Sequence, residues 1–138
     1  MSETITTWTG NEGNNVSRRT YVFVSADGGS AEAVMGVIEN VLGRSFIREP
    51  GADPYLRADP LAVYVSGHDF DDGDIDFPDG TPAPLRSGYP NLVDVRDTER
   101  DQGRQEEAAG RIYAALTAGG SRRAILVDDM QHVRARSG

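Results

Sequence analysis

The chain has 138 residues and a formal net charge of −8, because 22 acidic residues outnumber 14 basic ones. This length favours one domain with a hydrophobic core of its own. The absence of cysteine excludes disulfides and thiolate metal sites, and a sequence pI near 4.6 disfavours nucleic-acid binding, since the negative field would repel phosphates. Because no apolar run is long enough for a secretory signal or a membrane-spanning helix, we expect a cytoplasmic protein.

The first predicted elements are a polar arm, a buried strand and a helix. Residues 1–19 are rich in threonine, asparagine and glycine and predict an arm, with a short edge strand near Trp8 as the alternative. Residues 20–26 are β-branched, aromatic or small, which is typical of a central strand. Ser30 is a favourable N-cap for the following helix, and Gly43 is placed to end it. The apolar residues of this helix recur with helical spacing: Val34, Val37, Ile38, Val41 and Leu42.

The next segments are less regular, except for a second clear strand. Residues 44–49 fit a short strand, and residues 50–60 predict a loop that contains Tyr55 and Leu56. Residues 61–66 have the composition of a strongly predicted strand.

Negative charge is concentrated in one window of the sequence. Residues 49–80 contain nine acidic residues and one arginine, while the other 106 residues hold 13 of each kind and balance to zero. Six aspartates fall within twelve residues of this window: Asp69, Asp71, Asp72, Asp74, Asp76 and Asp79. The alternation around Ile75 and Phe77 favours a half-buried strand or hairpin that turns its aspartates outward. A segment of this kind, folded onto one face, projects a directed negative field.

The last third of the chain alternates between loops and regular elements. In order, the pattern predicts a surface loop over 78–90, a strand over 91–96, a charged segment over 97–105, a helix ending near Ala118, a strand over 123–128 and a polar tail over 131–138.

These elements predict a single α+β domain over residues 20–130. Two helices with similar apolar stripes can cover one face of a mainly antiparallel sheet of four to five strands. The right-handed crossover rule makes a ferredoxin-like, split βαβ arrangement the economical connection. The opposite face of the sheet would then be free for partners.

Several patterns that carry chemistry in other proteins are incomplete in this chain. The acidic segment lacks the glycine and glutamate positions of a calcium-binding loop, and the turn over residues 27–30 lacks the lysine of a phosphate-binding loop. Ser66, His68 and Asp69 are close in sequence, but neighbours on a strand point to opposite faces. We therefore expect no catalysis, no cofactor and no bound metal.

An acidic surface with aromatic residues beside it is typical of an interface that meets a basic protein. Carboxylates accelerate the encounter, and aromatic side chains contribute contact energy. We expect the six aspartates to contact such a partner together with Tyr55, Phe70 and Tyr89.

The order of these segments resembles that of small acidic α+β immunity proteins of bacterial polymorphic toxin systems. The resemblance covers residues 20–128 and is carried by VFVSADGGSAEAVMGVIENVLG, LAVYVSGHDFDDGDIDFP, YPNLVDVR and AILVDD, with an FP…YP spacing. It implies a cytoplasmic antitoxin that binds and neutralises a cognate toxin or nuclease without catalysis. The alternative is a ferredoxin-like small-molecule-sensing or regulatory domain, and either protein would be a monomer or a homodimer.

Overall fold

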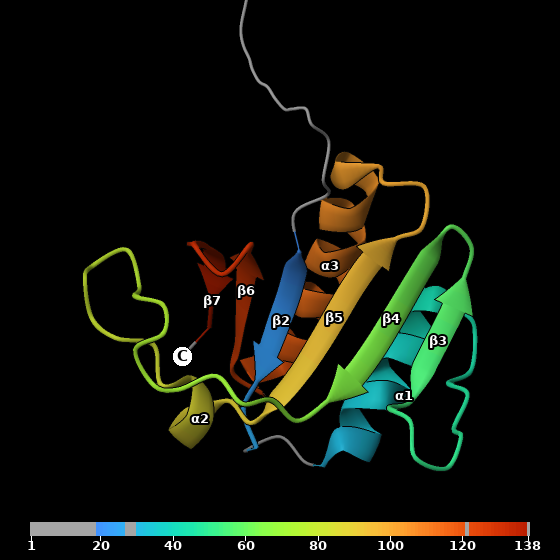
Figure 1. Ribbon diagram of the computed structural model, residues 1–138, viewed down its shortest axis with the longest axis horizontal. Helices are drawn as coiled ribbons and strands as arrows, with labels where there is room; N and C mark the ends of the chain where they lie inside the picture. The colour runs from blue at the N-terminus through green and yellow to red at the C-terminus, as the bar shows by residue number, and fades with distance from the viewer. Residues whose placement is uncertain (1–18, 27–29, 121, 138) are drawn as a thin grey trace, which may run out of the picture.

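The computed structural model describes residues 19–26, 30–120 and 122–137, so the predicted arm lies outside it apart from Arg19. Six strands form one sheet in the order β3-β4-β5-β2-β6-β7, and every neighbouring pair is antiparallel (Figure 1). The strands are β2 (Thr20–Val24), β3 (Tyr55–Ala58), β4 (Leu61–Ser66), β5 (Asn91–Asp97), β6 (Ala124–Asp128) and β7 (His132–Arg136). The helices are α1 (Ala31–Leu42), α2 (Leu85–Gly88) and α3 (Gln102–Thr117), and a short 3₁₀ turn, η1 (Ala118–Gly120), follows α3.

β2 lies between β5 and β6, in the interior of the sheet, as its composition indicates. All five of its residues are buried, and Val22 lies opposite Val93 on one side and Leu126 on the other. Because successive side chains of a strand point to opposite faces, β2 requires a cover on both faces of the sheet.

The helices α1 and α3 cover one face of the sheet (Figure 1). The Ser30 hydroxyl accepts a backbone N–H in the first turn of α1, and Gly43 ends the helix with a left-handed φ of 69°. Asp101 caps α3 in the same way. Ile38 and Ile112, from the apolar sides of the two helices, join the core that faces the strands. The predicted α+β class, with two helices on one face of an antiparallel sheet, is confirmed.

The inner strands are connected in a split βαβ order. β2 and β4 run in the same direction, and β5 lies between them antiparallel to both, while β6 flanks β2 on its other side. The sheet has six strands instead of the predicted four to five, because β3 and β7 are added at its two edges.

β3 corrects the prediction of a loop over residues 50–60. Leu56 is 0% exposed, whereas Tyr55 and Arg57 on either side of it point to the other face. The strand has only four residues and is flanked by prolines, which obscured its alternation. Of the strand predicted over 44–49, only Ile47 forms a bridge, with Tyr55.

β7 corrects the prediction of a polar tail over residues 131–138. It pairs with β6 through a turn in which Asp129 and Met130 have positive φ angles of 54° and 53°. The N–H of Gln131 closes this turn on the carbonyl of Asp128 at 3.0 Å. Such turns usually contain asparagine or glycine, so the sequence carried no hairpin signal here.

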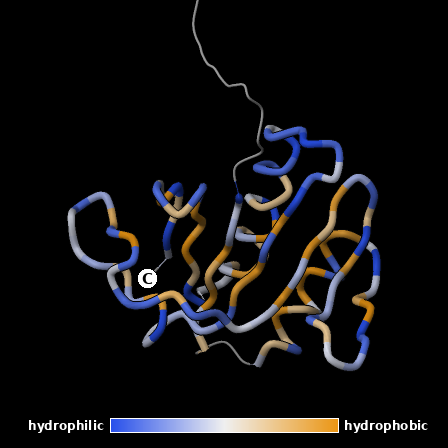
Figure 2. Tube along the Cα trace, viewed as in Figure 1, coloured by the Kyte–Doolittle hydropathy of each residue, from blue (hydrophilic) through white to orange (hydrophobic). Residues whose placement is uncertain are grey.

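The segment between β4 and β5 covers part of the other face of the sheet. We call residues 67–90, which include α2, the lid. Hydrophobic residues run along the strands, and hydrophilic residues lie along the outer loop of the lid (Figure 2). Ile75 is 5% exposed, as its alternation predicts, although a single bridge between Asp76 and Pro82 replaces the predicted strand. Lid and sheet share a second apolar cluster: Tyr21, Phe23, Ile75, Ala83, Leu85, Tyr89, Leu92, Ile125 and Val127.

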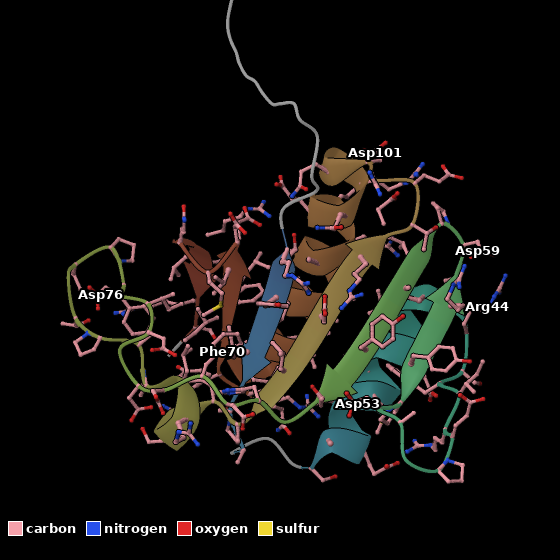
Figure 3. All side chains as sticks on the ribbon, viewed as in Figure 1. Arg44, Asp53, Asp59, Phe70, Asp76 and Asp101 are labelled. Atoms are coloured by element: carbon pink, nitrogen blue, oxygen red, sulfur yellow. The ribbon has the colours of Figure 1, made fainter. Side chains whose placement is uncertain are left out.

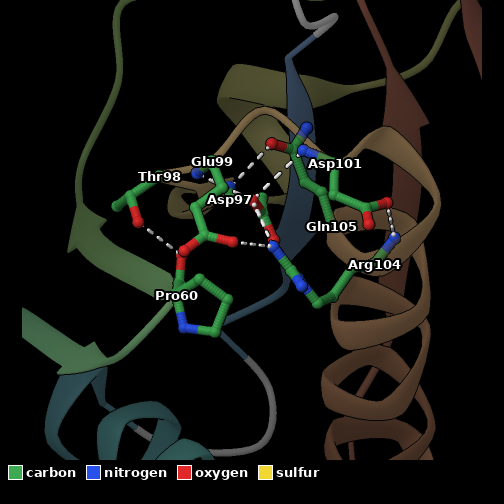
Figure 4. A network of polar contacts seen from close by, with 7 residues as sticks. All are labelled: Pro60, Asp97, Thr98, Glu99, Asp101, Arg104 and Gln105. Carbon is green, nitrogen blue, oxygen red and sulfur yellow. Dashed lines mark hydrogen bonds and ion pairs between the residues drawn. The ribbon is translucent and has the colours of Figure 1, made fainter.

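A buried polar network joins the end of β5 to the start of α3 (Figure 4). The Asp97 carboxylate accepts two N–H groups from the turn over residues 99–101, at 2.8 and 3.1 Å, and pairs with Arg104. Gln105 accepts the backbone N–H of Asp97 at 2.9 Å and donates to the Thr20 hydroxyl at 2.8 Å. The bonds to the carboxylate, chiefly the side-chain bond from Arg104 and then the two backbone N–H groups, lower the pKa of Asp97 to about 2.

We expect Asp97→Asn to lower the free energy of unfolding near pH 7 by about 1 to 2 kcal/mol, because an amide cannot replace the charge-assisted bonds. The pKa of this carboxyl is about 2 in the folded protein and about 3.9 in an unfolded chain. Its contribution to stability is therefore complete above about pH 4 and is lost as the pH falls toward about 2. When urea unfolding is measured across this pH range, the free energy of unfolding should fall less in acid for the variant than for the parent protein.

Asp59→Asn is the matched control, since it removes an exposed carboxylate that pairs with Arg57. This substitution should change the unfolding free energy little. Equal losses from the two substitutions would contradict a special role for the buried network.

Candidate partner-binding surface on the lid

The lid carries all six aspartates of the acidic segment, and each of them is exposed. Arg86 is the one basic residue of the lid other than histidine. The contacts of the carboxylates divide the aspartates into those that hold the lid in shape and those that remain available.

Asp72 caps the short helix α2 from a distant position in the sequence. Its Oδ1 accepts the backbone N–H groups of Arg86 at 2.8 Å and Ser87 at 2.9 Å. The side-chain hydrogen bond from Ser87, followed by the backbone bonds from Ser87 and Arg86, lowers the pKa of the Asp72 carboxyl. Pro84, at the N-cap position, makes no side-chain hydrogen bond, so Asp72 supplies the acceptor that the first turn requires.

Asp71, Asp74 and Arg86 define the turn that precedes this cap. Arg86 donates from Nε to Asp71 Oδ1 at 2.8 Å and from Nη2 to the carbonyl of Asp69 at 2.9 Å. Asp74 Oδ2 accepts the backbone N–H of Asp71 at 2.8 Å. Because the ion pair is exposed, it stabilises the lid little as a charge pair and mainly orients the turn.

Asp79 shapes the outer turn of the lid. Its Oδ1 accepts the N–H and the hydroxyl of Thr81, at 2.9 and 2.6 Å, and these bonds lower the pKa of its carboxyl. Arg136 of β7 lies 3.9 Å from Asp79 Oδ2, and its guanidinium stacks 4.0 Å from the centre of the Phe77 ring. A shallow groove of about 270 Å³ lies between lid and strand here, lined by Pro78, Asp79, Val133, Arg134, Ala135 and Arg136.

Asp69 and Asp76 are the aspartates whose carboxylates remain available. Neither carboxylate makes a hydrogen bond or an ion pair with another residue in the described part of the chain. Asp76 lies at the outer end of the molecule, away from Asp53 and Asp59 at the opposite side of the sheet (Figure 3).

The aromatic residues predicted to contact a partner are not displayed beside the aspartates. Tyr89 is 4% exposed, and Phe70 packs on Tyr21 and Phe23 with ring centroids 6.1 and 5.8 Å apart. Tyr55 lies on β3, at the edge of the sheet opposite to β7. The aspartates of the lid are exposed, whereas its apolar residues turn toward the sheet and join the second cluster.

On the same face of the sheet, outside the second cluster, the predicted Tyr55 lies with three residues that sequence reasoning missed: Tyr64, Asp94 and Arg96. Tyr55 and Tyr64 lie on neighbouring strands with ring centroids 6.1 Å apart, and Arg96 lies 4.9 Å from the centre of the Tyr64 ring. Arg96 pairs with Asp94 at 2.8 Å, and the other oxygen of Asp94 is buried without a hydrogen bond to any described residue. The alternation of side chains along the strands could have placed this group on one face of the sheet. That inference required β3 to be recognised as a strand.

His68 is the second residue of the lid, and its contacts do not form a catalytic triad with its neighbours. Its Nε2 lies 2.8 Å from the carbonyl of Tyr89, and its Nδ1 accepts the N–H of Phe70 at 3.1 Å. Both ring nitrogens therefore bond to the backbone, and neither is available to activate the hydroxyl of Ser66.

Metal-binding clusters and membrane helices were sought among the described residues. Within them, no three histidine or carboxylate side chains lie together in a group that would hold a metal ion. No helix in the same residues is both long and apolar enough to cross a membrane.

Comparison of the chain with protein-family models gives no match, and comparisons with curated proteins and with solved structures give none either. A functional assignment therefore depends on the geometry and charge of the chain itself.

We expect Asp72→Ala to raise amide hydrogen exchange at Arg86 and Ser87 roughly fivefold, because α2 loses its cap. The matched control is Asp76→Ala, which removes the same charge from a carboxylate that holds no backbone group. In this control variant, the exchange rates of the Arg86 and Ser87 amides should remain those of the parent protein. Similar increases in both variants would indicate a general electrostatic effect of the lid instead of a cap.

Proposed function

We propose that this chain is a cytoplasmic immunity-type protein that binds and neutralises a basic partner, a toxin or a nuclease, through the outer side of the lid. The observation that supports this function is an ordered lid that exposes six carboxylates while its apolar side chains are buried on the sheet. The proposal involves no catalytic step and no cofactor.

The charge of the lid favours a partner of opposite sign. Within the lid, six aspartates are offset by one arginine, Arg86, which is already paired with Asp71, and Arg136 of β7 lies 3.9 Å from Asp79. A surface of one sign steers an oppositely charged protein toward it and raises the association rate, most strongly at low ionic strength. A nuclease must attract phosphate, so a basic active site of that kind is complementary to this surface.

The proposed contact residues differ from those expected from the sequence. Asp69 and Asp76 take the central role, because their carboxylates hold no part of the lid in place. Tyr64 and Arg96, on the same face of the sheet, are the proposed aromatic and arginine contacts, since both residue types are enriched where interfaces carry most energy. Phe70 and Tyr89 support the lid from beneath.

The double variant Asp69→Asn/Asp76→Asn tests this proposal with the product of the neighbouring gene as the candidate partner. We expect the association rate constant to fall about tenfold at low ionic strength, with little change in the dissociation rate. Stopped-flow or surface-plasmon measurements should show that this difference disappears in about 0.5 M NaCl, where screening is strong.

A matched control removes the same two charges at the other side of the sheet. Asp53→Asn/Asp59→Asn should leave the association rate close to that of the parent protein. Equal losses in the two double variants, or binding that does not respond to salt, would contradict recognition through the lid. If neither the neighbouring gene product nor any basic protein from the native source binds at low salt, the immunity-type function is contradicted.

A further inference from the structure

β7 is the last strand of the sheet, and its outer side has no strand partner in the described part of the chain. Ser137, which follows β7, donates its N–H to the carbonyl of Ala124 in β6 at 3.0 Å. Because neighbouring residues of a strand direct their backbone groups to opposite sides, the N–H and the carbonyl of Arg136 point away from β6. β7 therefore presents a main-chain donor and a main-chain acceptor at its free edge.

The outer turn of the lid lies beside this edge without pairing with it (Figure 1). In that turn, Phe77 donates its N–H to the carbonyl of Thr81, and Gly80 donates to the carbonyl of Phe77, each at 2.8 Å. Pro78 has no N–H to donate. The backbone of the turn is thus bonded within itself, and the groove of about 270 Å³ remains between Pro78 and Asp79 of the lid and the strand.

Two arginines of β7 line the groove, and neither of them donates a hydrogen bond to another described residue. Arg134 reaches its carboxylate partner only at 3.5 Å and Arg136 only at 3.9 Å, and the two side chains are 37% and 43% exposed. By contrast, Arg48 donates to both carboxylate oxygens of Glu32, at 2.6 and 2.8 Å. The N–H groups of the two groove arginines are therefore available to a ligand.

The other residues of the groove favour a carboxylate as that ligand. The guanidinium of Arg136 lies 4.0 Å from the centre of the Phe77 ring, and Val133 and Ala135 add apolar lining. A guanidinium on an aromatic ring presents its N–H groups as a planar fork that matches a carboxylate. Among the lining residues, two arginines outnumber one aspartate. The groove thus combines a strand edge with donors for negatively charged side chains.

We propose that the free edge of β7 binds an extended acidic peptide, which adds a strand to the sheet and places carboxylates against Arg134 and Arg136. Main-chain hydrogen bonds to the edge contribute affinity, and the two guanidiniums select acidic side chains. Screening at physiological ionic strength limits the repulsion from the more distant aspartates of the lid. This inference goes beyond the proposed function, since Asp69 and Asp76 take no part in it.

A short fluorescein-labelled peptide of alternating glutamate and valine, added to the full chain, tests the site. In amide NMR spectra it should shift the signals of Val133, Ala135 and Arg136 and leave those of β3, at the opposite edge of the sheet, unchanged. A peptide with lysine in place of glutamate should not produce these shifts, because it would meet two arginines. A glutamate peptide with alternate N-methylated amides should bind about tenfold more weakly, because it cannot complete the bonds to the edge.

The double variant Arg134→Gln/Arg136→Gln should lower the affinity for the glutamate peptide about tenfold, as measured by fluorescence anisotropy. The matched control is Arg48→Gln/Arg57→Gln, which removes the same charge from exposed arginines that pair with carboxylates at 2.6 and 2.7 Å. Its affinity for the peptide should remain that of the parent protein.

Several results would overturn the proposal. One is a spectrum of β7 that does not change with millimolar glutamate peptide, and another is an equal loss of affinity in the two double variants. Equal binding of the N-methylated peptide would exclude strand addition, and this comparison remains decisive if a variant fails to fold. If the same β7 signals shift with protein concentration as a dimer forms without peptide, the edge belongs to a second copy of the chain.

Discussion

The need to bury both faces of β2 is the constraint on which the rest of this structure depends. Val22 and Val24 enter the core beneath the helices, whereas Tyr21 and Phe23 enter the second cluster on the opposite face. Both long helices lie on one side, so the second cover must come from the connection between β4 and β5. The lid is thus a consequence of two aromatic side chains in a strand that has neighbours on both sides.

This constraint explains why one acidic segment also contains deeply buried apolar residues. Ile75, Leu85 and Tyr89 attach the lid to the sheet, and carboxylates such as that of Asp72 satisfy backbone groups that have no ladder partner. The aspartates therefore serve two purposes. Some replace the hydrogen bonds of regular structure, and Asp69 and Asp76 contribute charge without a local partner in the described part of the chain.

Elsewhere in the molecule, arginines and carboxylates meet at short distances. Arg96 pairs with Asp94, and Arg48 pairs with Glu32. In the buried network, Arg104 pairs with Asp97. This local pairing is consistent with the zero balance of the chain outside residues 49–80. The lid, with six aspartates and one arginine, therefore carries most of the unbalanced negative charge of the chain.

The sequence alone determined the elements whose burial pattern is local and strong, namely β2, β4, β5, β6 and the two long helices with their caps at Ser30 and Gly43. It also determined that Asp74 and Asp76 face outward on either side of the buried Ile75, since neighbours in an extended segment point to opposite sides. Only the tertiary structure decided that residues 55–58 and 132–136 are edge strands, because short strands acquire their identity from the neighbour they pair with. The inward orientation of Tyr89 was likewise decided by the sheet surface beneath the lid, because an aromatic ring packs against whichever apolar surface the rest of the chain brings to it.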